Sequence, residues 1–319
     1  MNSTELQDLV DRALDHHKLS IARLTAVFED QRPTAFQLRR EALNLLQKHK
    51  KRRQAIFIGI TGAPGSGKST LLGRTAPKVA NQGDLYCAVL AVDPSSPISG
   101  GALLGDRTRV RFSADEPRLY FRSQASATEL GGIGPWTFHA CRLYYHLFDC
   151  VFVETVGIGQ SEIGVRYLAD HLFLVLQPMT GDQIQFLKAG VMEVPDAIIL
   201  NKSDEEPAAS RTYHSLVSSL TLSHQFDNPP KVLRASAKDG SGIHEIAADI
   251  IGFVRATEPP GMAGKEQKHF SDWVTNEWGR QGLRLLSRYG GGPASYLQAH
   301  ATLDDAQQTF ASHMRHWLA

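Results

Sequence analysis

The sequence has few cysteines and no long apolar run. Three cysteines occur in 319 residues, at Cys87, Cys141 and Cys150, and they form no CxxC pair and no zinc-ligand spacing. We therefore expect buried structural thiols in a reducing compartment. No apolar run reaches the roughly 18 residues of a membrane span. Residues 1–17 carry acidic side chains and lack the apolar core of a signal peptide. These absences predict a cytoplasmic protein with no membrane partner.

The sequence also lacks an excess of charge of either sign. Its 34 Lys and Arg residues nearly balance 33 Asp and Glu residues, so the formal net charge is +1. A nearly neutral protein has no general attraction to nucleic acid, and we expect no nucleic-acid partner. The hydrophobic content of 42% is ordinary for a globular protein and is sufficient for a full core.

Residues 1–54 predict a helical N-terminal extension. Thr4 and Gln7 fit a capping box, and apolar residues within 6–14 recur at helical spacing. The same pattern continues in a second segment, and a third helix is expected over 35–46.

Residues 259–319 predict a helical C-terminal arm. The stretch 256–268 reads ATEPPGMAGKEQK, which is typical of a linker. Helical spacing follows over 270–289, the sequence GGGP at 290–293 interrupts it, and a last helix is expected over 303–317. Such an arm has no strand to add to a sheet, so it packs either on its own chain or on a second subunit.

Residues 55–258 alternate short apolar runs with amphipathic segments. This alternation predicts an α/β domain with a mostly parallel central sheet flanked by helices. The runs expected as strands are Ala55–Ile60, Tyr86–Val92, Cys150–Glu154, Leu172–Leu176, Ala197–Leu200 and Lys231–Ala235. The segments expected as helices are Lys68–Val79, Trp136–Leu147, Gln183–Val194, Arg211–Leu222 and Ile243–Val254.

A phosphate-binding loop follows the first expected strand. Residues 62–69 read GAPGSGKS and match the pattern GxxxxGK[ST] between a strand and a helix. The glycines let successive N–H groups surround a phosphate, and the following helix adds its positive end. Lys68 would contact the β- and γ-phosphates, and Ser69 would give its hydroxyl to Mg²⁺. The predicted phosphate-binding residues are Gly62, Ala63, Pro64, Gly65, Ser66, Gly67, Lys68, Ser69 and Thr70.

Two further motifs predict that the bound base is guanine. Asp204 in the sequence NKSD can accept from both N1–H and the exocyclic amine of guanine, whereas adenine offers neither donor. The stem of Lys202 can lie on the ring. The SAK sequence that begins at Ser236 is expected to turn a backbone N–H toward the guanine oxygen. The ligand is therefore expected to be GTP or GDP, and the predicted base-binding residues are Asn201, Lys202, Asp204, Ser236, Ala237 and Lys238.

Acidic residues between these motifs are candidates for Mg²⁺ and for catalysis. Glu154 and Gly157 occupy the place of the DxxG switch, with Glu in place of Asp, and Asp93 and Asp106 flank a Ser- and Gly-rich loop. Either Asp alone also fits a loop cap, and Arg107 and Arg109 fit either charge stabilisers or surface residues. The predicted metal ligands are Ser69, Asp93, Asp106 and Glu154, and the predicted catalytic residues are Lys68, Asp93, Asp106, Glu154 and Gly157.

A resemblance to a known family rests on three long segments. They read VDPSSPISGGALLGDRTR, VETVGIGQSE and GDQIQFLKAGVMEVPDAIILNKSD. They resemble the MeaB/ArgK group of P-loop GTPases, the G-protein chaperones of adenosylcobalamin-dependent acyl-CoA mutases, which are related to the methylmalonic aciduria type A protein. The resemblance covers the N-terminal helices, the nucleotide-binding domain and the C-terminal arm.

The resemblance implies a fold, an assembly and a partner. The fold would be the P-loop NTPase branch that includes the signal-recognition and nickel-chaperone GTPases. The C-terminal arm would hold a homodimer together, and GTP would gate cofactor delivery to the mutase and protect it. Residues 181–194 would form an additional switch. Ahead of that switch the family pattern PGxGD is altered, because Met179 replaces a glycine.

Three other functions remain open at this point. A nickel chaperone is expected to have a His-rich tract, whereas only His16 and His17 of the 13 histidines are adjacent. A kinase of amino-acid transport would prefer ATP, and NKSD argues against that preference. A signalling protein with little turnover is supported by the lack of an obvious water-positioning glutamine, although Gln160 follows Gly157 by three residues. We predict slow intrinsic hydrolysis that a partner accelerates.

Overall fold

The computed structural model describes residues 1–30, 32–49, 54–93, 116–125, 133, 135–155, 161–178, 195–222 and 229–318. The chain forms two compact units. The helical unit comprises Met1–Arg52, Phe138–His146 and Pro260–Ala319, and the sheet unit comprises Arg53–Thr137 and Leu147–Pro259. These units are defined by packing, so the division into 1–54, 55–258 and 259–319 stays a prediction.

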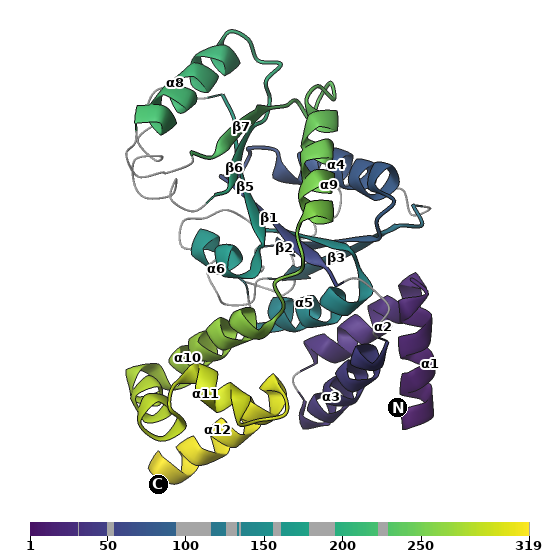
Figure 1. Ribbon diagram of the computed structural model, residues 1–319, viewed down its shortest axis with the longest axis vertical. Coiled ribbons are helices and arrows are strands. Elements are labelled where there is room, and N and C mark those ends of the chain that lie inside the picture. Colours follow the sequence, from purple (N-terminus) through teal and green to yellow (C-terminus); the bar gives the residue numbers. More distant parts are fainter. Residues whose placement is uncertain are drawn as a thin grey trace. The chain divides into compact units, whose positions relative to one another are not determined.

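The sheet unit is built on one parallel sheet (Figure 1). Within the described ranges seven strands lie in the order β3-β2-β4-β1-β5-β6-β7, and all neighbouring pairs are parallel. This confirms the predicted sheet. The strands are β1 (Ile56–Thr61), β2 (Cys87–Asp93), β3 (Leu119–Ala125), β4 (Cys150–Glu154), β5 (His171–Leu176), β6 (Ala197–Leu200) and β7 (Lys231–Arg234).

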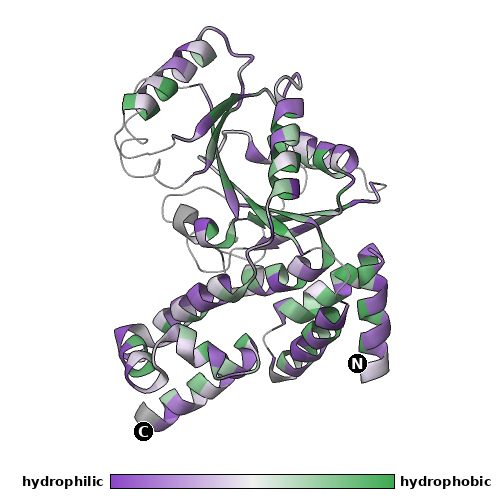
Figure 2. Cartoon of the chain, in the orientation of Figure 1, coloured by the Kyte–Doolittle hydropathy of each residue, from purple (hydrophilic) through white to green (hydrophobic). Residues whose placement is uncertain are grey.

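Strand β3 is absent from the predicted strands. It lies at the edge of the sheet, and its sequence LYFRSQA contains three consecutive polar residues. An edge strand is less completely buried than a central one, so its apolar signal is weak. The central strands give the opposite pattern, and Figure 2 shows them as predominantly hydrophobic.

Helices of the sheet unit cover both faces of the sheet. They include α4 (Lys68–Gly83), α6 (Ser161–Leu168), α8 (Ala208–Leu222) and α9 (Ile243–Ala256). Helices α4 and α9 share one core with alternate strand residues, and α8 packs on the opposite face. On β5, for example, Val175 belongs to the first core and Leu174 to the second. Successive strand side chains point to opposite faces, which explains why most residues of the central strands are apolar.

The helical unit joins segments from the two ends of the chain. Its helices are α1 (Ser3–Leu14), α2 (Lys18–Glu29), α3 (Pro33–Lys48), α10 (Ala263–Gly290), α11 (Pro293–Gln298) and α12 (Leu303–Leu318), together with Phe138–His146 of α5 (Pro135–Leu147). Helical structure in both terminal segments agrees with the prediction. The three cysteines of the chain are buried and free, as expected.

Two local predictions in the helical unit are wrong. The capping box of α1 is formed by Asn2 and Glu5, whose side chains exchange hydrogen bonds of 2.9 Å with each other's backbone N–H groups, and not by Thr4 and Gln7. Asn2 caps the helix two residues earlier than the predicted cap Thr4, so the helix starts at Ser3. The predicted linker 256–268 is also too long, because α10 begins at Ala263.

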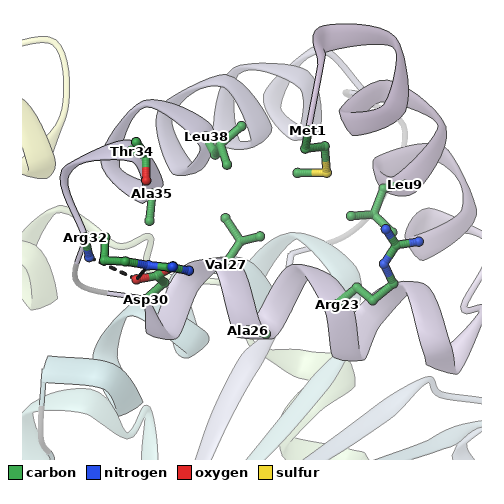
Figure 3. Close-up of a pocket in the computed structure, with 10 residues that line it drawn as sticks. All are labelled: Met1, Leu9, Arg23, Ala26, Val27, Asp30, Arg32, Thr34, Ala35 and Leu38. Atoms are coloured by element: carbon green, nitrogen blue, oxygen red, sulfur yellow. Dashed lines mark hydrogen bonds and ion pairs between the residues drawn. The ribbon is translucent and has the colours of Figure 1, made fainter.

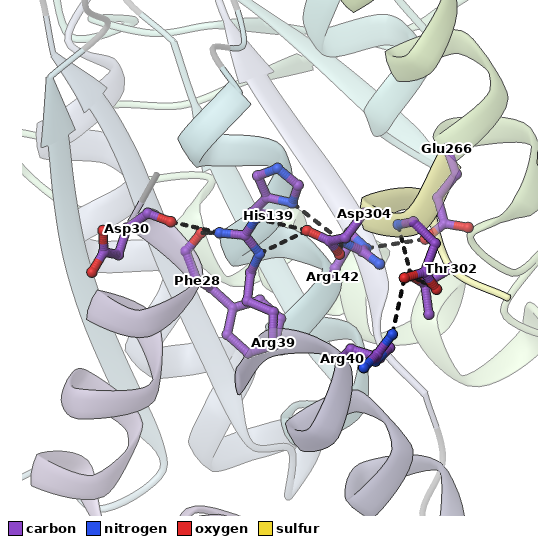
Figure 4. Close-up of polar contacts among 10 residues, drawn as sticks. Phe28, Asp30, Arg39, Arg40, His139, Arg142, Glu266, Thr302 and Asp304 are labelled. Atoms are coloured by element: carbon purple, nitrogen blue, oxygen red, sulfur yellow. Dashed lines mark hydrogen bonds and ion pairs between the residues drawn. The ribbon is translucent and has the colours of Figure 1, made fainter. Parts of the chain in front are cut away.

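A cluster of charged side chains connects four helices of this unit (Figure 4). Arg39 of α3 donates to Asp304 of α12 at 2.6 and 2.9 Å, and Arg142 of α5 donates to the same carboxylate at 2.7 Å. Arg142 also contacts Glu266 of α10 at 3.1 Å. Burial acts to raise the pKa of Asp304, but the guanidinium groups of Arg142 and Arg39 hold it below its ordinary value. Asp304 therefore joins N-terminal, central and C-terminal segments through charge.

Candidate functional site

The predicted nucleotide motifs come together at the carboxyl edge of the sheet. In the strand register, Ile60 lies beside Glu154, and Leu200 lies beside both Leu176 and Arg234. The residues that follow these strands therefore emerge at one edge, where parallel α/β sheets bind ligands. The phosphate loop follows β1, NKSD follows β6 and SAK lies just after β7.

The phosphate loop approaches its neighbours too closely for a side chain at two of its glycines. A Cβ atom on Gly62 would lie 2.1 Å from the carbonyl oxygen of Val175, and a Cβ on Gly67 would lie 2.4 Å from Asn201 Nδ2. Both glycines have positive φ values, 142° and 86°. The loop thus needs glycine both for its backbone conformation and for its packing. Ala63, Pro64 and Gly65 are exposed between them, so this part of the loop backbone is open to a ligand.

Lys68 and Ser69 begin helix α4 directly after this loop. The buried Lys68 Nζ donates to the carbonyl oxygens of Gly62 and Ala63 at 2.7 and 3.2 Å. Ser69 Oγ donates to Glu154 Oε1 at 2.5 Å. A hydroxyl and a carboxylate therefore meet at the start of α4, next to the predicted phosphate site. Thr70 is exposed on the first turn of α4.

Asn201 connects the phosphate loop with the SAK segment. Its Nδ2 atom donates to the Ser66 carbonyl at 2.8 Å, and its Oδ1 atom accepts from the Ala237 N–H at 3.0 Å. Asn201 and Ser66 are both buried. This side chain uses both ends of its amide within the protein, so it holds the two halves of the site at a fixed separation. The sequence predicted that one backbone N–H of the SAK segment faces guanine, and the Ala237 N–H of that segment donates here to Asn201.

Asp204 is held in place by Ser236. Ser236 Oγ donates to Asp204 Oδ1 at 2.6 Å and accepts from the N–H of Lys238 at 3.2 Å. Lys238 Nζ lies 3.4 Å from Asp204 Oδ2. The hydrogen bond from Ser236, together with Lys238, lowers the pKa of Asp204, which keeps the carboxylate ionised at neutral pH. An ionised carboxylate is the acceptor that guanine recognition requires.

Two residues that the sequence motifs do not include also contact the site. Gln177 Oε1 accepts from Lys202 Nζ at 2.5 Å, and Arg74 Nη2 of α4 donates to the Lys238 carbonyl at 2.9 Å. Gln177 directly follows β5, so its place at the carboxyl edge was a usable signal. Nothing in the local sequence marks Arg74, because its contact depends on how α4 meets the SAK segment.

Several predicted residues lie outside the described part of the chain. They are Asp106, Arg107, Arg109, Gly157, Gln160, the predicted switch at residues 181–194 and Met179 ahead of that switch. Asp93 ends β2 at the carboxyl edge, but its side chain also lies outside the description. The described site therefore comprises the phosphate loop, Glu154, NKSD and SAK.

The metal-ligating side chains, helices and cavities of the described ranges bear on other kinds of site. No group of three or more His, Cys, Asp or Glu side chains there is placed to hold a metal ion. None of the helices in the described ranges is long and apolar enough to cross a membrane. A cavity of about 290 Å³ lies among α1, α2 and α3, and Figure 3 shows Leu9, Val27 and Leu38 on its wall with Arg23 and Arg32. None of the predicted nucleotide residues lines it.

Comparison with known proteins gives consistent matches. A family model described as Methylmalonyl Co-A mutase-associated GTPase MeaB matches residues 21–283. The GTPase ArgK of Escherichia coli is 32% identical over 294 residues, which cover 90% of this chain and 87% of that protein. The mitochondrial methylmalonic aciduria type A homolog of Mus musculus is 36% identical over 225 residues, which cover 69% of this chain and 54% of that protein. A crystal structure of LAO/AO transport system kinase has the same fold, with a TM-score of 0.60, 24% identity, and coverage of 91% of this chain and 98% of that one.

Proposed function

This chain belongs to the MeaB family of methylmalonyl-CoA mutase-associated GTPases and is a GTP-hydrolysing enzyme, and from this premise we propose that its GTP cycle serves an adenosylcobalamin-dependent acyl-CoA mutase. In this proposal the protein binds the mutase, gates delivery of the cofactor and protects the mutase from inactivation. The extent of the family match carries the proposal. Residues 21–283 include most of α2, all of α3 and most of α10, so the similarity extends well beyond the nucleotide motifs.

We further propose how the carboxyl edge of the sheet holds GTP. The loop at 62–70 surrounds the phosphates, and Lys68 exchanges the carbonyl oxygens of Gly62 and Ala63 for phosphate oxygens. Asp204 accepts from the guanine, and the stem of Lys202 covers the ring. Asn201 keeps the phosphate-binding and base-binding halves at the right separation, because it is hydrogen-bonded to Ser66 in one and Ala237 in the other.

The donor set near the phosphate loop fits Mg²⁺. Ser69 and Glu154 offer hard oxygen atoms that lie 2.5 Å apart, and Mg²⁺ in nucleotide sites takes one or two such protein ligands together with phosphate oxygens and water. Ser69 and Glu154, with Asp93 and Asp106, would hold the ion. Mg²⁺ supplies charge neutralisation on the transferred phosphoryl group. Lys68 contributes a second positive charge there, and Gly157 is proposed to sense the γ-phosphate.

The nucleotide part of the proposal is tested with Asp204→Asn. The amide presents a donor where guanine requires an acceptor, so GDP affinity should fall at least about tenfold, and xanthosine diphosphate, which carries an oxygen at that position, should bind better than GDP. Calorimetry with Mg²⁺ measures both affinities. Asp249→Asn is the matched control, because Asp249 lies on α9 and pairs with Lys231 outside the site. Equal binding of ATP and GTP by the unmodified protein would contradict the proposal and favour the kinase alternative.

The proposed mutase partner is tested by adding the adenosylcobalamin-dependent mutase of the same organism. We expect slow GTP hydrolysis by the purified protein alone, faster hydrolysis with the mutase, and a complex that elutes together in gel filtration. Lys68→Ala is the control that should abolish turnover in both conditions. Rapid turnover of the protein alone, with no complex and no acceleration by any such mutase, would refute the proposal that the protein serves a mutase.

We also propose that residues 259–319 form the interface of a homodimer. The resemblance to the family motivates this assembly. Light scattering should give twice the chain mass of 35.1 kDa. A monomer over the whole working concentration range would refute the dimer without affecting the nucleotide proposal.

A further inference from the structure

Lys202 has an unusual backbone conformation. Its φ is 56°, in the left-handed region, which is sparsely populated by residues other than glycine. Hydrogen bonds on both sides hold it there, because Asn201 N–H donates to the Leu176 carbonyl and Ser203 N–H to the Ala235 carbonyl, at 2.8 and 2.9 Å. A strained conformation that its surroundings enforce is frequent at ligand-binding sites. The backbone therefore directs the Lys202 side chain in a way that an ordinary strand end would not.

The side chain of Lys202 is fixed at its far end by Gln177. Lys202 Nζ donates to Gln177 Oε1 at 2.5 Å, and both residues are only partly exposed. No carboxylate among the described residues forms an ion pair with Lys202. Gln177 follows β5 and Lys202 follows β6, and these adjacent strands pair at Leu176 and Leu200. This hydrogen bond therefore joins the residues that follow two neighbouring strands.

A fixed end is useful for a side chain whose stem covers a base. A free lysine samples many rotamers, and ordering it on ligand binding reduces affinity. An acceptor that already holds the ammonium group removes part of that cost before the nucleotide arrives. Because the acceptor is a neutral amide, the positive charge of Lys202 is not cancelled and still attracts a polyanionic nucleotide.

We propose that Gln177 is a positioning residue for guanine nucleotides, which acts by holding the Lys202 ammonium group so that the lysine stem is ready to cover the base. This inference rests on the proposed nucleotide site. It adds to the three nucleotide motifs a residue that belongs to none of them. It also gives a role to the polar side chain that directly follows the apolar run Leu172–Leu176 of β5.

The test compares two substitutions at Gln177. Gln177→Met keeps the length of the side chain and removes the acceptor, and GDP affinity should fall about tenfold in calorimetry with Mg²⁺. Gln177→Glu restores an acceptor oxygen and should return the affinity to within about threefold of the unmodified protein. Gln82→Met, at an exposed position of α4, is the matched control and should change nothing.

A double-mutant cycle with Lys202→Met separates positioning from general damage. If Gln177 acts through Lys202, then Gln177→Met should have no further effect on GDP affinity in the Lys202→Met protein. Additive losses, or a Gln177→Met protein that binds GDP as tightly as the unmodified one, would overturn the inference. Failure of Gln177→Glu to restore binding would also overturn it. Failure of the unmodified protein to bind GDP would instead refute the proposed nucleotide site.

Discussion

At the scale of single residues, the phosphate loop shows how packing and ligand binding constrain the same atoms. Gly62 must approach the Val175 carbonyl, and Gly67 must approach Asn201. Gly65 differs from both, because a Cβ atom there would meet nothing within 4 Å although its φ is also positive, at 80°. Gly62 and Gly67 are therefore required by both packing and backbone conformation, whereas Gly65 is required by backbone conformation alone.

We predict that Gly62→Ala destabilises the protein much more than Gly65→Ala. The first substitution adds a backbone clash to the unfavourable φ and should cost about 3 kcal/mol or more, whereas the second carries only the conformational cost of about 1 kcal/mol. Urea denaturation without nucleotide measures both changes in the free energy of unfolding. Equal losses for the two variants would mean that the loop relaxes around Gly62.

At the scale of helices, the buried charge cluster determines how the helical unit is held together. Helices α3 and α12 carry Arg39 and Asp304, which are separated by 265 positions in the chain. The exposed fraction of both side chains is 2%. Removing one member of a buried ion pair is costly because the other charge is left without compensation in a medium of low dielectric constant.

Asp304→Ala should therefore lower the free energy of unfolding of the helical unit by about 3–5 kcal/mol. The variant leaves two buried guanidinium groups, Arg39 and Arg142, without their shared carboxylate. Asp8→Ala is the comparison, because Asp8 forms an exposed pair with Arg12 and should contribute less than about 1 kcal/mol. Thermal unfolding monitored by circular dichroism compares the two, and similar effects would show that the cluster adds little stability.

At the scale of the whole molecule, histidines that are buried or partly buried make stability depend on pH. Burial lowers the pKa of His139, His146, His171 and His269, to about 4 for His146 and about 3 for His269. These groups stay neutral in the folded protein, while in the unfolded chain they bind protons below about pH 6.5. The unfolded state then binds more protons, so stability is complete above pH 6.5 and is lost as the pH falls from there toward 4 and 3.

We predict that His269→Phe reduces this acid sensitivity. His269 stacks on Phe138 with ring centroids 4.1 Å apart, and its buried Nε2 has no hydrogen-bond partner among the described residues, so a phenyl ring suits the same environment. The slope of the free energy of unfolding between pH 6 and 4 should fall by up to about 1.4 kcal/mol per pH unit, the contribution of one proton. Phe310→Leu is the control, because Phe310 packs on Phe270 and Trp278, and its loss should lower stability at every pH without changing the slope.

The sequence by itself determined the features that depend on neighbouring residues. Apolar runs predicted six of the strands, and the spacing of Gly62, Lys68 and Ser69 predicted a phosphate loop between a strand and a helix. These signals are local, because burial on both faces of a strand and positive φ at a glycine impose requirements on a few consecutive residues. The edge strand β3 was missed for the same reason, since partial burial permits a polar sequence.

Only the tertiary structure decided the contacts between distant residues. Asn201 reaches Ser66 across 135 positions, and Asp304 unites helices from both ends of the chain with α5. Lys202 receives its partner from the adjacent strand end at Gln177. Such contacts arise because strands distant in sequence become neighbours in the sheet, and a hydrogen bond depends on the distance and direction between two atoms, which the order of residues along the chain does not specify.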